Sequence, residues 1–467
     1  MNYQGAIEMK MKPVTLEKIA EVTGGAFFGP RFSRKDRITG VTTDSREVEP
    51  GNLFVCIKGA RVDGHNFAEK AAASGAVCRL SERRLDDGCP YILVDDTLKA
   101  LRDLAAYYRS LFQIPVIGII GSVGKTTAKE LTAAVLLREK CVLKTHANLN
   151  NEIGVPLTLL NLREEHEAAV VEMGISDFGE MRILAEMVRP DIVVMTSIGY
   201  CHLEKLGDLK GVLRAKSEVF EFTEPDSVAI LNGDDVNLRG LDTGTNVVTY
   251  GLGENNDYRA ENLESLGFKG ISCDIVGPDM RIFALIPAFG SHIAYGALAA
   301  AAVGRTLGIS PENILRGLAD YHPVGGRANV SYTDLVTIID DTYNANPNSM
   351  AAAVRSLSSL RAIGQAQGKR IAILGDMKEL GADSAALHRS IGRLAAEVGI
   401  DLVVAIGDDA GNIADGCAEK GGNAVYLRRK EELYPYLKRL IQKGDVVLVK
   451  ASHSMEFSEI VEKLKAL

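Results

Sequence analysis

Residues 115–140 read PVIGIIGSVGKTTAKELTAAVLLREK, and this stretch decides the fold class. The first six residues form a short, nearly continuous apolar run, which is typical of a strand buried on both faces of a parallel sheet. Residues 121–127 are expected to form a loop and residues 128–140 a helix. A buried strand, a glycine-containing loop and a helix in this order predict a parallel α/β domain.

The loop has the residue types that bind phosphate. Glycines let the backbone curl so that its N–H groups point into one concavity, and a helix N-terminus adds partial positive charge there. Lys125 can reach the β- and γ-phosphates, and the Thr126 hydroxyl can bind Mg²⁺. An incidental turn with a lysine is the alternative. We predict that a nucleotide contacts Gly121, Ser122, Val123, Gly124, Lys125, Thr126 and Thr127.

The spacing of the loop differs from the usual Walker A pattern, which has glycine five positions before Gly124. This chain has Ile119 there. The loop is therefore a shortened G-x-x-G-K-T-[ST] variant, and it argues against ordinary P-loop kinases and GTPases.

The rest of the chain predicts an α/β protein of three domains. At roughly 100–200 residues per domain, 467 residues correspond to two to four domains. Strand-like runs such as AAVVEMG, DIVVMTSIG and SVAILNGDD alternate with helical stretches, which predicts a doubly wound, mostly parallel central sheet. Residues 265–289 read as antiparallel strands. We expect a small mixed α/β domain at 1–113, a central P-loop domain at 114–322 and a Rossmann-like domain at 323–467.

Composition excludes several classes of protein. The formal net charge is −8, so the chain has no overall electrostatic attraction to nucleic acid or to anionic membrane. No apolar run approaches the roughly 18 residues of a membrane span, and the first 22 residues lack the apolar core of a signal peptide. The seven cysteines are scattered and odd in number. Reduced thiols in a cytoplasmic protein explain them better than a disulfide framework.

Three further residues stand where ligands of a phosphate-bound metal would be expected. Glu172 ends one strand-like run, His202 follows the next, and the carboxyl ends of parallel strands meet at the ligand crevice. Lys216 lies on an expected helix after them. Each has an ordinary alternative: a solvated strand-end carboxylate, a structural histidine and a surface lysine. The acidic pair in LNGDD, residues 231–235, lines the nucleotide site or merely caps a helix.

These motifs together resemble the Mur ligases. The resemblance rests on GSVGKTT, the run NLNNEIGVP at residues 148–156, EMG, the pair His202 and Lys216, and the segment DDTYNANPNSM. It covers essentially the whole chain. It implies a cytoplasmic, monomeric, ATP- and Mg²⁺-dependent ligase of peptidoglycan precursor synthesis that forms an amide bond through an acyl phosphate.

The resemblance also implies the substrates. DDTYNANPNS and ILGDMKELG are similar to the branch that adds D-alanyl-D-alanine to UDP-N-acetylmuramoyl-tripeptide, and the D-N-P-R signature of the diaminopimelate-adding branch is absent. A ligase of the same superfamily that adds one amino acid is the alternative, and a P-loop NTPase without ligase activity is a second. The segment TTDSREVEPGNLFVCIKGARVDGHNF is similar to the family's UDP-sugar module, which implies contacts from Ser45, Arg46, Lys58, Gly59, Asp63, Gly64 and His65.

The remaining site residues are carried over by the same resemblance. Thr126, Glu172, His202 and a carbamylated Lys216 would bind metal, with Lys125, Lys216, His202 and Arg327 as the catalytic set. Arg327 would reach the γ-phosphate from a hinge at 323–327. The nucleotide would also contact Asp341, Asn344 and Asn346, and the acyl-transfer region would include Asn150, Asn151, Lys450 and Ser452.

Two departures from the family pattern affect these expectations. The helix that usually begins G-x-H-N-x-x-N has Ile293 and Gly296 at the asparagine positions, so the adenine contacts of the family do not transfer. The C-terminal segment has Ala451 and His453 in place of the family's glycine and arginine. Histidine lacks the fixed bidentate fork of arginine.

Overall fold

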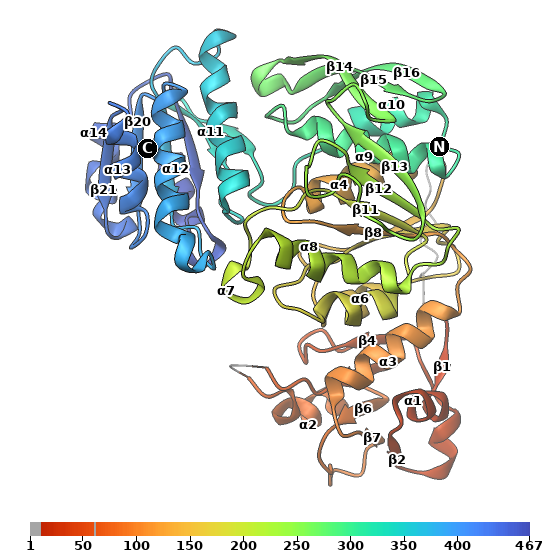
Figure 1. Cartoon of the computed structure of the whole chain (residues 1–467). Helices are drawn as coiled ribbons and strands as arrows, with labels where there is room; N and C mark the ends of the chain where they lie inside the picture. Colours follow the sequence, from red (N-terminus) through yellow and green to blue (C-terminus); the bar gives the residue numbers. More distant parts are fainter. Residues whose placement is uncertain (1–10, 60–61) are drawn as a thin grey trace.

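The computed structural model describes residues 11–59 and 62–467, which fold into three α/β domains. In Figure 1 the N-terminal domain lies below the central domain, and the C-terminal domain lies beside it. The mostly parallel sheets and the three-domain arrangement agree with the fold class expected from the sequence. None of the helices in these residues is both long and apolar enough to cross a membrane.

The N-terminal domain is built on a five-stranded sheet of order β2-β7-β6-β5-β4, in which only β2 pairs antiparallel. Its helix α1 ends at Gly24, whose φ of 63° gives the left-handed C-cap that the Gly24–Gly25 pair predicts. The elements are β1 (Val14–Thr15), α1 (Leu16–Thr23), β2 (Ala26–Phe28), β3 (Arg37–Ile38), β4 (Gly40–Thr42), β5 (Asn52–Val55), α2 (Ala68–Ala73), β6 (Cys78–Ser81), β7 (Tyr91–Leu93) and α3 (Thr97–Ser110).

The central domain holds a nine-stranded sheet of order β16-β15-β14-β13-β12-β11-β8-β10-β9, parallel from β9 to β14. Its elements are β8 (Val116–Ile120), α4 (Lys125–Leu136), β9 (Val142–Lys144), α5 (Gly154–Leu159), β10 (Ala168–Glu172), α6 (Glu180–Val188), β11 (Ile192–Met195), α7 (Leu203–Leu206), α8 (Leu209–Ser217), β12 (Val228–Asn232), β13 (Asn246–Gly251), β14 (Tyr258–Ser265), β15 (Ile271–Gly277), β16 (Met280–Ile286), α9 (Ile293–Thr306) and α10 (Pro311–Ala319).

Strand β8 is buried on both faces, as its apolar run predicts. Val116 and Ile120 join a core that continues into the N-terminal domain, whereas Ile117 and Ile119 join a core beneath α4 and α9. Two expectations need correction. Helix α4 begins at Lys125, three residues before the expected start, because the phosphate loop closes directly into its first turn. The antiparallel strands begin at Tyr258 rather than near residue 265.

The C-terminal domain has a six-stranded sheet of order β17-β18-β22-β19-β20-β21, parallel except for β17. The edge strands β17, which reads NVSY, and β21, which reads AVYL, are absent from the strands that the sequence predicts. The elements are β17 (Asn329–Tyr332), β18 (Val336–Asp340), α11 (Pro347–Ala362), β19 (Arg370–Gly375), α12 (Ser384–Glu397), β20 (Leu402–Ile406), α13 (Gly411–Glu419), β21 (Ala424–Leu427), α14 (Leu437–Leu440), β22 (Asp445–Lys450) and α15 (Ser458–Lys465).

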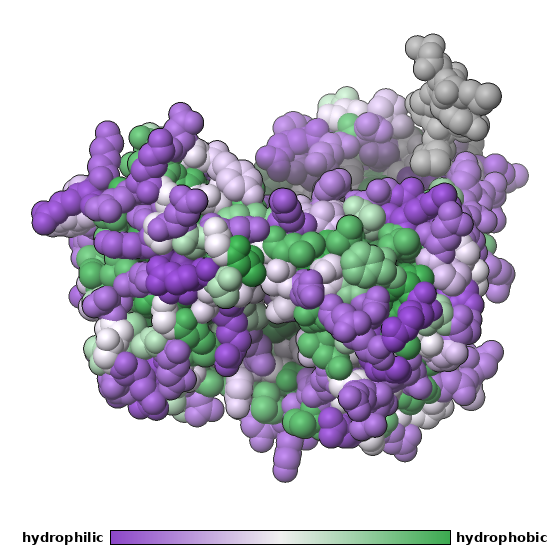
Figure 2. All heavy atoms as spheres, turned by 90° about the horizontal axis from the view of Figure 1, so that it is seen from above, coloured by the Kyte–Doolittle hydropathy of each residue, from purple (hydrophilic) through white to green (hydrophobic). Residues whose placement is uncertain are grey.

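The surface seen in Figure 2 is mostly hydrophilic at its rim, and none of the cysteines forms a disulfide. Seen from above, hydrophilic side chains cover most of the outer rim of the molecule, and hydrophobic ones lie mainly toward the middle of the view (Figure 2). All seven cysteines are free, and five of them are buried. Burial raises the pKa of Cys56 to about 12, so this thiol is inert at neutral pH.

Candidate active site

The phosphate loop is held in a strained, tightly packed curve. Gly121 has a φ of 144°, and an added Cβ would lie 1.9 Å from Thr196 Oγ1, so only glycine fits there. The Thr196 hydroxyl donates to the carbonyl of Val123 at 2.6 Å, and the backbone N–H of Ser122 donates to the carbonyl of Ser197 at 2.8 Å. The segment after β11 therefore fixes the shape of the loop.

Lys125 is the first residue of α4 and lines the cavity above the loop. Its Nζ donates to the carbonyl of Gly121 at 2.8 Å, and no described carboxylate pairs with it. Burial lowers the pKa of Lys125, because a charged ammonium loses hydration there. An anionic phosphate would restore the lost stabilisation of this cation.

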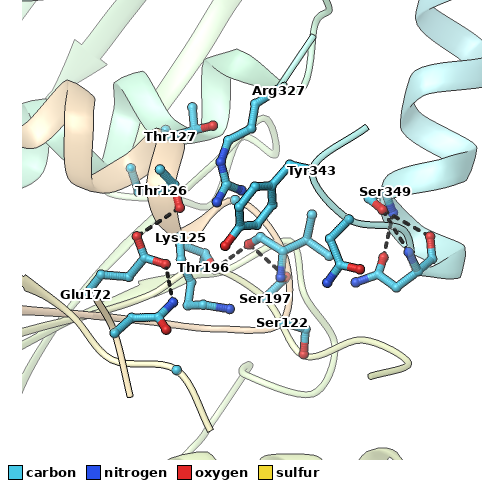
Figure 3. A pocket seen from close by; sticks show the side chains of 18 of the residues that line it. Ser122, Lys125, Thr126, Thr127, Glu172, Thr196, Ser197, Arg327, Tyr343 and Ser349 are labelled. Atoms are coloured by element: carbon cyan, nitrogen blue, oxygen red, sulfur yellow. Dashed lines mark hydrogen bonds between the residues drawn. The ribbon is translucent and has the colours of Figure 1, made fainter. Parts of the chain in front are cut away.

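Thr126, Asn150 and Glu172 form one polar cluster at the carboxyl ends of β8 and β10. Thr126 Oγ1 donates to Glu172 Oε2 at 2.8 Å, and Asn150 Nδ2 donates to Glu172 Oε1 at 2.8 Å (Figure 3). Glu172 is 1% exposed, so it is no solvated strand-end carboxylate. Its hard oxygen atoms and the Thr126 hydroxyl suit Mg²⁺, which commonly binds one or two carboxylates and substrate phosphates.

His202 and Lys216 come from the segment that follows β11. His202 precedes α7 and lines the cavity, and its Nδ1 contacts a carboxylate oxygen of Glu379 in the C-terminal domain. Lys216 lies on α8 and is 1% exposed, with no described hydrogen-bond or ion-pair partner for its amine. Burial lowers the pKa of Lys216 to about 8. The surface-lysine alternative is therefore wrong.

The C-terminal domain supplies the opposite wall of the cavity. The guanidinium of Arg327 lies 3.7 Å from the centre of the Tyr343 ring, and Figure 3 shows both side chains close to Lys125. Lys450 Nζ pairs with Asp341 Oδ2 at 2.6 Å and donates to the carbonyl of Asn344 at 2.9 Å. This wall thus carries two cations. Lys450 is paired with a carboxylate, whereas Arg327 stacks on an aromatic ring.

These two walls enclose a cavity of about 710 Å³, large enough for a nucleotide. Most of the expected site residues line it: Ser122, Val123, Gly124, Lys125, Thr126, Thr127, Asn150, Asn151, Glu172, His202, Arg327, Asp341, Asn344, Asn346 and Lys450. Gly121, Lys216 and Ser452 do not.

Some of these side chains already have structural partners. Asn346 Oδ1 accepts from the N–H of Ser349 at 2.8 Å and caps helix α11. Asn151 Oδ1 accepts from the N–H of Gly154 at 2.9 Å. Ser452 Oγ accepts from the N–H of Lys378 at 2.9 Å. Each of these three side chains therefore holds the local backbone in place.

The residues that line the cavity without having been assigned to the site from the sequence include Asn232, Tyr250, Tyr295 and Tyr343. Tyr295 lies between Ile293 and Gly296, the two positions where the family pattern has asparagine. Its hydroxyl donates to Asp234 Oδ2 at 3.1 Å. Asp234 also accepts from the N–H of Gly253 at 3.1 Å, so it ties loops together and caps no helix. The LNGDD segment reaches the cavity through Asn232, not through its carboxylates.

The expected UDP-sugar residues lie in the N-terminal domain, outside this cavity. Arg46 pairs with Asp44 at 2.5 Å yet keeps 81% of its side chain exposed. His65 is buried, with Nδ1 2.7 Å from Asp63 Oδ1 and Nε2 accepting from the N–H of Glu82 at 2.9 Å. Both ring nitrogens are occupied, so His65 shapes the loop, whereas Arg46 is available to a ligand.

In the rest of the expected UDP-sugar segment, the contacts are mainly between backbone atoms. An added Cβ at Gly64 would lie 2.8 Å from the carbonyl of Ile57, so glycine allows a close approach of two chain segments. Gly59 donates its N–H to the carbonyl of Val62 at 2.9 Å, and Lys58 and Asp63 form an isolated β-bridge. Ser45 is half-buried beside Arg46.

Comparison with known proteins follows the same three-part division. Residues 37–109 match the model of the Mur ligase family, catalytic domain; residues 119–304 match the Mur ligase middle domain; residues 326–453 match the Mur ligase, glutamate ligase domain.

Full-length relatives are similar along nearly the whole chain. The UDP-N-acetylmuramoyl-tripeptide–D-alanyl-D-alanine ligase of Bacillus subtilis is 38% identical, over 96% of this chain and 98% of its own. The enzyme of the same name from Escherichia coli is 36% identical, over 97% and 99%.

Solved structures agree in fold. A crystal structure of MurF from Acinetobacter baumannii matches with a TM-score of 0.90 at 32% identity, covering 98% of this chain and all of its own. The MurF ligase of Thermotoga maritima in complex with ADP matches with a TM-score of 0.81 at 29% identity, covering 91% and 97%.

Proposed function

The chain belongs to the Mur ligase family, and we infer that it adds D-alanyl-D-alanine to UDP-N-acetylmuramoyl-tripeptide in an ATP-dependent reaction that forms an amide bond. It is a ligase of peptidoglycan precursor synthesis. The observation that carries this function is the cavity in which the phosphate loop of the central domain faces Arg327, Asp341 and Lys450 of the C-terminal domain. We place the reaction in the cytoplasm.

We assign one substrate to each domain. Residues 1–113 hold the UDP-sugar, residues 114–322 hold ATP, and residues 323–467 hold the incoming dipeptide. The exposed guanidinium of Arg46 supports the first assignment, because arginine matches a diphosphate bidentately. Ser45, Lys58, Gly59, Asp63, Gly64 and His65 shape or complete this site. We propose that the protein acts as a monomer.

The reaction needs an activated carboxyl group, since a free carboxylate is a poor electrophile. The terminal carboxylate of the tripeptide attacks the γ-phosphorus of ATP, and ADP leaves as an acyl phosphate forms. The free amine of D-alanyl-D-alanine then attacks the carbonyl carbon, loses a proton and expels inorganic phosphate. The protein positions the reactants and neutralises charge. Lys125 and Arg327 face the transferred phosphoryl group from two domains.

We propose Mg²⁺ as the accompanying metal, held by Thr126 and Glu172 at the first site. His202 and Lys216 complete a second site, with Lys216 carbamylated. When bound, Mg²⁺ draws charge from the phosphate oxygens. The 2.8 Å spacing of the Thr126 hydroxyl and Glu172 carboxylate and the hardness of these oxygen donors support the first site. A buried amine without an anionic partner supports the carbamylation of Lys216.

The nucleotide sugar and base contacts follow from the cavity walls. We propose that Asp341, with Asn344 and Asn346 beside it, faces the ribose, and that Tyr295 and Asn232 lie at the adenine end in place of the departed asparagines. Asn150, Asn151, Lys450 and Ser452 border the acyl-transfer region. Closure of the C-terminal domain about residues 323–327 excludes water from the acyl phosphate.

A coupled assay tests this function directly. The protein is mixed with ATP, Mg²⁺, D-alanyl-D-alanine and UDP-N-acetylmuramoyl-tripeptide, with diaminopimelate or lysine as the third residue, and ADP release is measured. We expect release only when both substrates are present, and little release when D-alanine replaces the dipeptide. ADP release that is independent of either substrate contradicts the ligase function.

A further inference from the structure

The central and C-terminal domains meet at the rim of the cavity through His202 and Glu379. His202 immediately precedes α7, and Glu379 lies in the loop between β19 and α12. Nδ1 of His202 contacts a carboxylate oxygen of Glu379. The backbone N–H of Glu204 also donates to the carbonyl of Glu379 at 3.4 Å. Figure 1 shows α7 on the side of the central domain that faces the C-terminal domain.

Both residues of this contact are held in an unusual backbone conformation. His202 has a φ of 53° and Glu379 a φ of 64°. Positive φ is uncommon outside glycine and costs roughly 1 kcal/mol or more, so the surrounding structure must impose it. Such imposed conformations cluster at functional sites. The pair is therefore a built contact between domains, not a chance meeting of two surface side chains.

The loop that carries Glu379 is anchored on several sides. The carboxylate of Asp376 accepts from the backbone N–H of Ala410 at 2.8 Å. The N–H of Met377 donates to His388 Nε2 at 2.9 Å, and the N–H of Lys378 donates to Ser452 Oγ at 2.9 Å. Three consecutive residues before Glu379 are thus fixed to the body of the C-terminal domain, which fixes the backbone from which the Glu379 side chain extends.

The segment that carries His202 is tied to the phosphate loop. The N–H of Gly199 donates to Ser122 Oγ at 2.9 Å, and Cys201 Sγ lies 3.2 Å from the same oxygen. The N–H of Tyr200 donates across the interface to Asn348 Oδ1 at 3.3 Å. Residues 199–202 therefore contact both the nucleotide-binding loop and the C-terminal domain.

The chemistry of histidine gives this contact a role. A histidine that binds metal through one ring nitrogen usually donates the other N–H to a carboxylate, which fixes its tautomer and ring orientation. His202 Nδ1 is buried and makes no regular hydrogen bond in the described chain, so the Glu379 carboxylate is the acceptor within reach of its proton. This leaves Nε2 for the metal.

We propose that Glu379 is a positioning residue that orients His202 toward Mg²⁺ and makes the metal site depend on the docked C-terminal domain. This inference rests on the proposed function, in which His202 binds Mg²⁺. Closure of the domain would then complete the charge-neutralising site at the moment when the acyl phosphate must be shielded from water.

The variant E379Q tests the proposal, because the amide keeps the shape of the side chain and removes its charge. Glu379 keeps 54% of its side chain exposed, so the substitution leaves no buried hole. Binding of Mn²⁺ is measured by electron paramagnetic resonance in the presence of a non-hydrolysable ATP analogue. We expect about tenfold or greater weakening of Mn²⁺ binding, the usual effect of losing such a partner. The exposed Asp383, four residues on, provides the control D383N, which should bind Mn²⁺ as the wild type does.

A spectroscopic readout separates orientation from a general structural effect. The chain has eight histidines, and ¹⁵N-histidine labelling with the variant H202N identifies the His202 signal. In the metal-free wild type we expect the Nδ1-protonated tautomer, and in E379Q a mixture of tautomers. An unchanged His202 signal or an unchanged Mn²⁺ affinity in E379Q overturns the proposal. Failure of the proposed function is seen separately, as substrate-independent ADP release by the wild type.

Discussion

The hydroxyl of Thr126 donates a 2.8 Å hydrogen bond to Glu172 Oε2, which joins the first turn of α4 to the end of strand β10. The two residues are 46 positions apart in sequence, but β8 and β10 are parallel neighbours in the sheet. Their carboxyl ends therefore open onto the same crevice. The pair places a hydroxyl and a carboxylate beside the phosphate loop, where a nucleotide-bound cation needs oxygen ligands.

The first prediction removes the charge of this carboxylate. E172Q keeps the volume of the side chain and one acceptor for Thr126, but loses the anion that we propose attracts Mg²⁺. We expect the Mg²⁺ concentration for half-maximal ADP release to rise about 10- to 100-fold, in the range of lost metal-site partners. The control E186Q, at an exposed position on α6, should leave the requirement unchanged. A normal Mg²⁺ requirement in E172Q would remove Glu172 from the metal site.

The second prediction concerns the lysine of the phosphate loop. In K125A the fold should remain, because Lys125 makes its one hydrogen bond to the nearby carbonyl of Gly121. ADP release should fall at least about 10²-fold, since one preorganised charge on the transferred phosphoryl group is lost. The exposed Lys210 on α8 offers the control K210A. Normal turnover in K125A, with an unchanged circular dichroism spectrum, contradicts the assignment of the loop.

The two glycines of the phosphate loop are predicted to differ in their tolerance of alanine. At Gly124, with a φ of 83°, an added Cβ meets nothing closer than Thr196 Cβ at 4.0 Å, so G124A costs only backbone strain of about 1–2 kcal/mol. At Gly121 the added Cβ also collides with Thr196 Oγ1 at 1.9 Å, which adds about 1–3 kcal/mol. Thermal unfolding should rank wild type above G124A and G124A above G121A. If G121A unfolded at a higher temperature than G124A, the contact between the added Cβ and Thr196 would be relieved by a local shift.

The sequence predicts most of the fold because its central signals are local. The apolar run before residue 121 is buried on both faces, as its pattern requires, and the glycine-to-helix transition follows directly from the loop chemistry. The edge strands β17 and β21 escaped prediction because they are half-exposed and short. The sequence predicts the start of α4 three residues too late, because the phosphate-binding motif assigns Lys125, Thr126 and Thr127 to the loop.

The candidate site also contains residues that the sequence predicts and residues that it does not. Lys125, Thr126 and Glu172 could be named from motif and strand-end position, and the fold brings them together. Tyr343, Tyr295 and Glu379 could not, because their roles arise from contacts between segments that are far apart in sequence. A tyrosine or glutamate has no distinctive signal before its neighbours are known.

The fourth prediction is that Lys216 carries a carbamate. A neutral amine attacks CO₂ and releases a proton as the carbamate forms, so the modification needs the deprotonated lysine. Burial lowers the pKa of Lys216 to about 8 from its usual 10.5, so the neutral amine becomes abundant near pH 8 and is lost as the pH falls below it. With ¹³C-bicarbonate, we expect a carbamate ¹³C signal that weakens from pH 8 to pH 6.5.

Two variants check the assignment of that signal. It should be absent in K216M and present in K210M, whose substituted lysine is exposed on the same helix. K216M should also lose most of its ligase activity, because the proposed second metal site then lacks its anion. A signal that persists in K216M places the carbamate on another amine.

The fifth prediction separates the charge of Arg327 from its shape. R327K keeps the cation but loses the planar fork and the face that stacks 3.7 Å from the centre of the Tyr343 ring. We expect kcat to fall about 10²-fold, the usual cost of one misplaced donor at a transferred group, with a smaller change in KM for ATP. The control R355K substitutes an exposed arginine on α11 and should be neutral.

Small-angle scattering should show compaction of the wild type with ATP analogue and substrate bound, and a weaker compaction of R327K. Equal kcat in R327K and wild type would mean that a point charge suffices, and that stacking on Tyr343 does not position the guanidinium for the reaction.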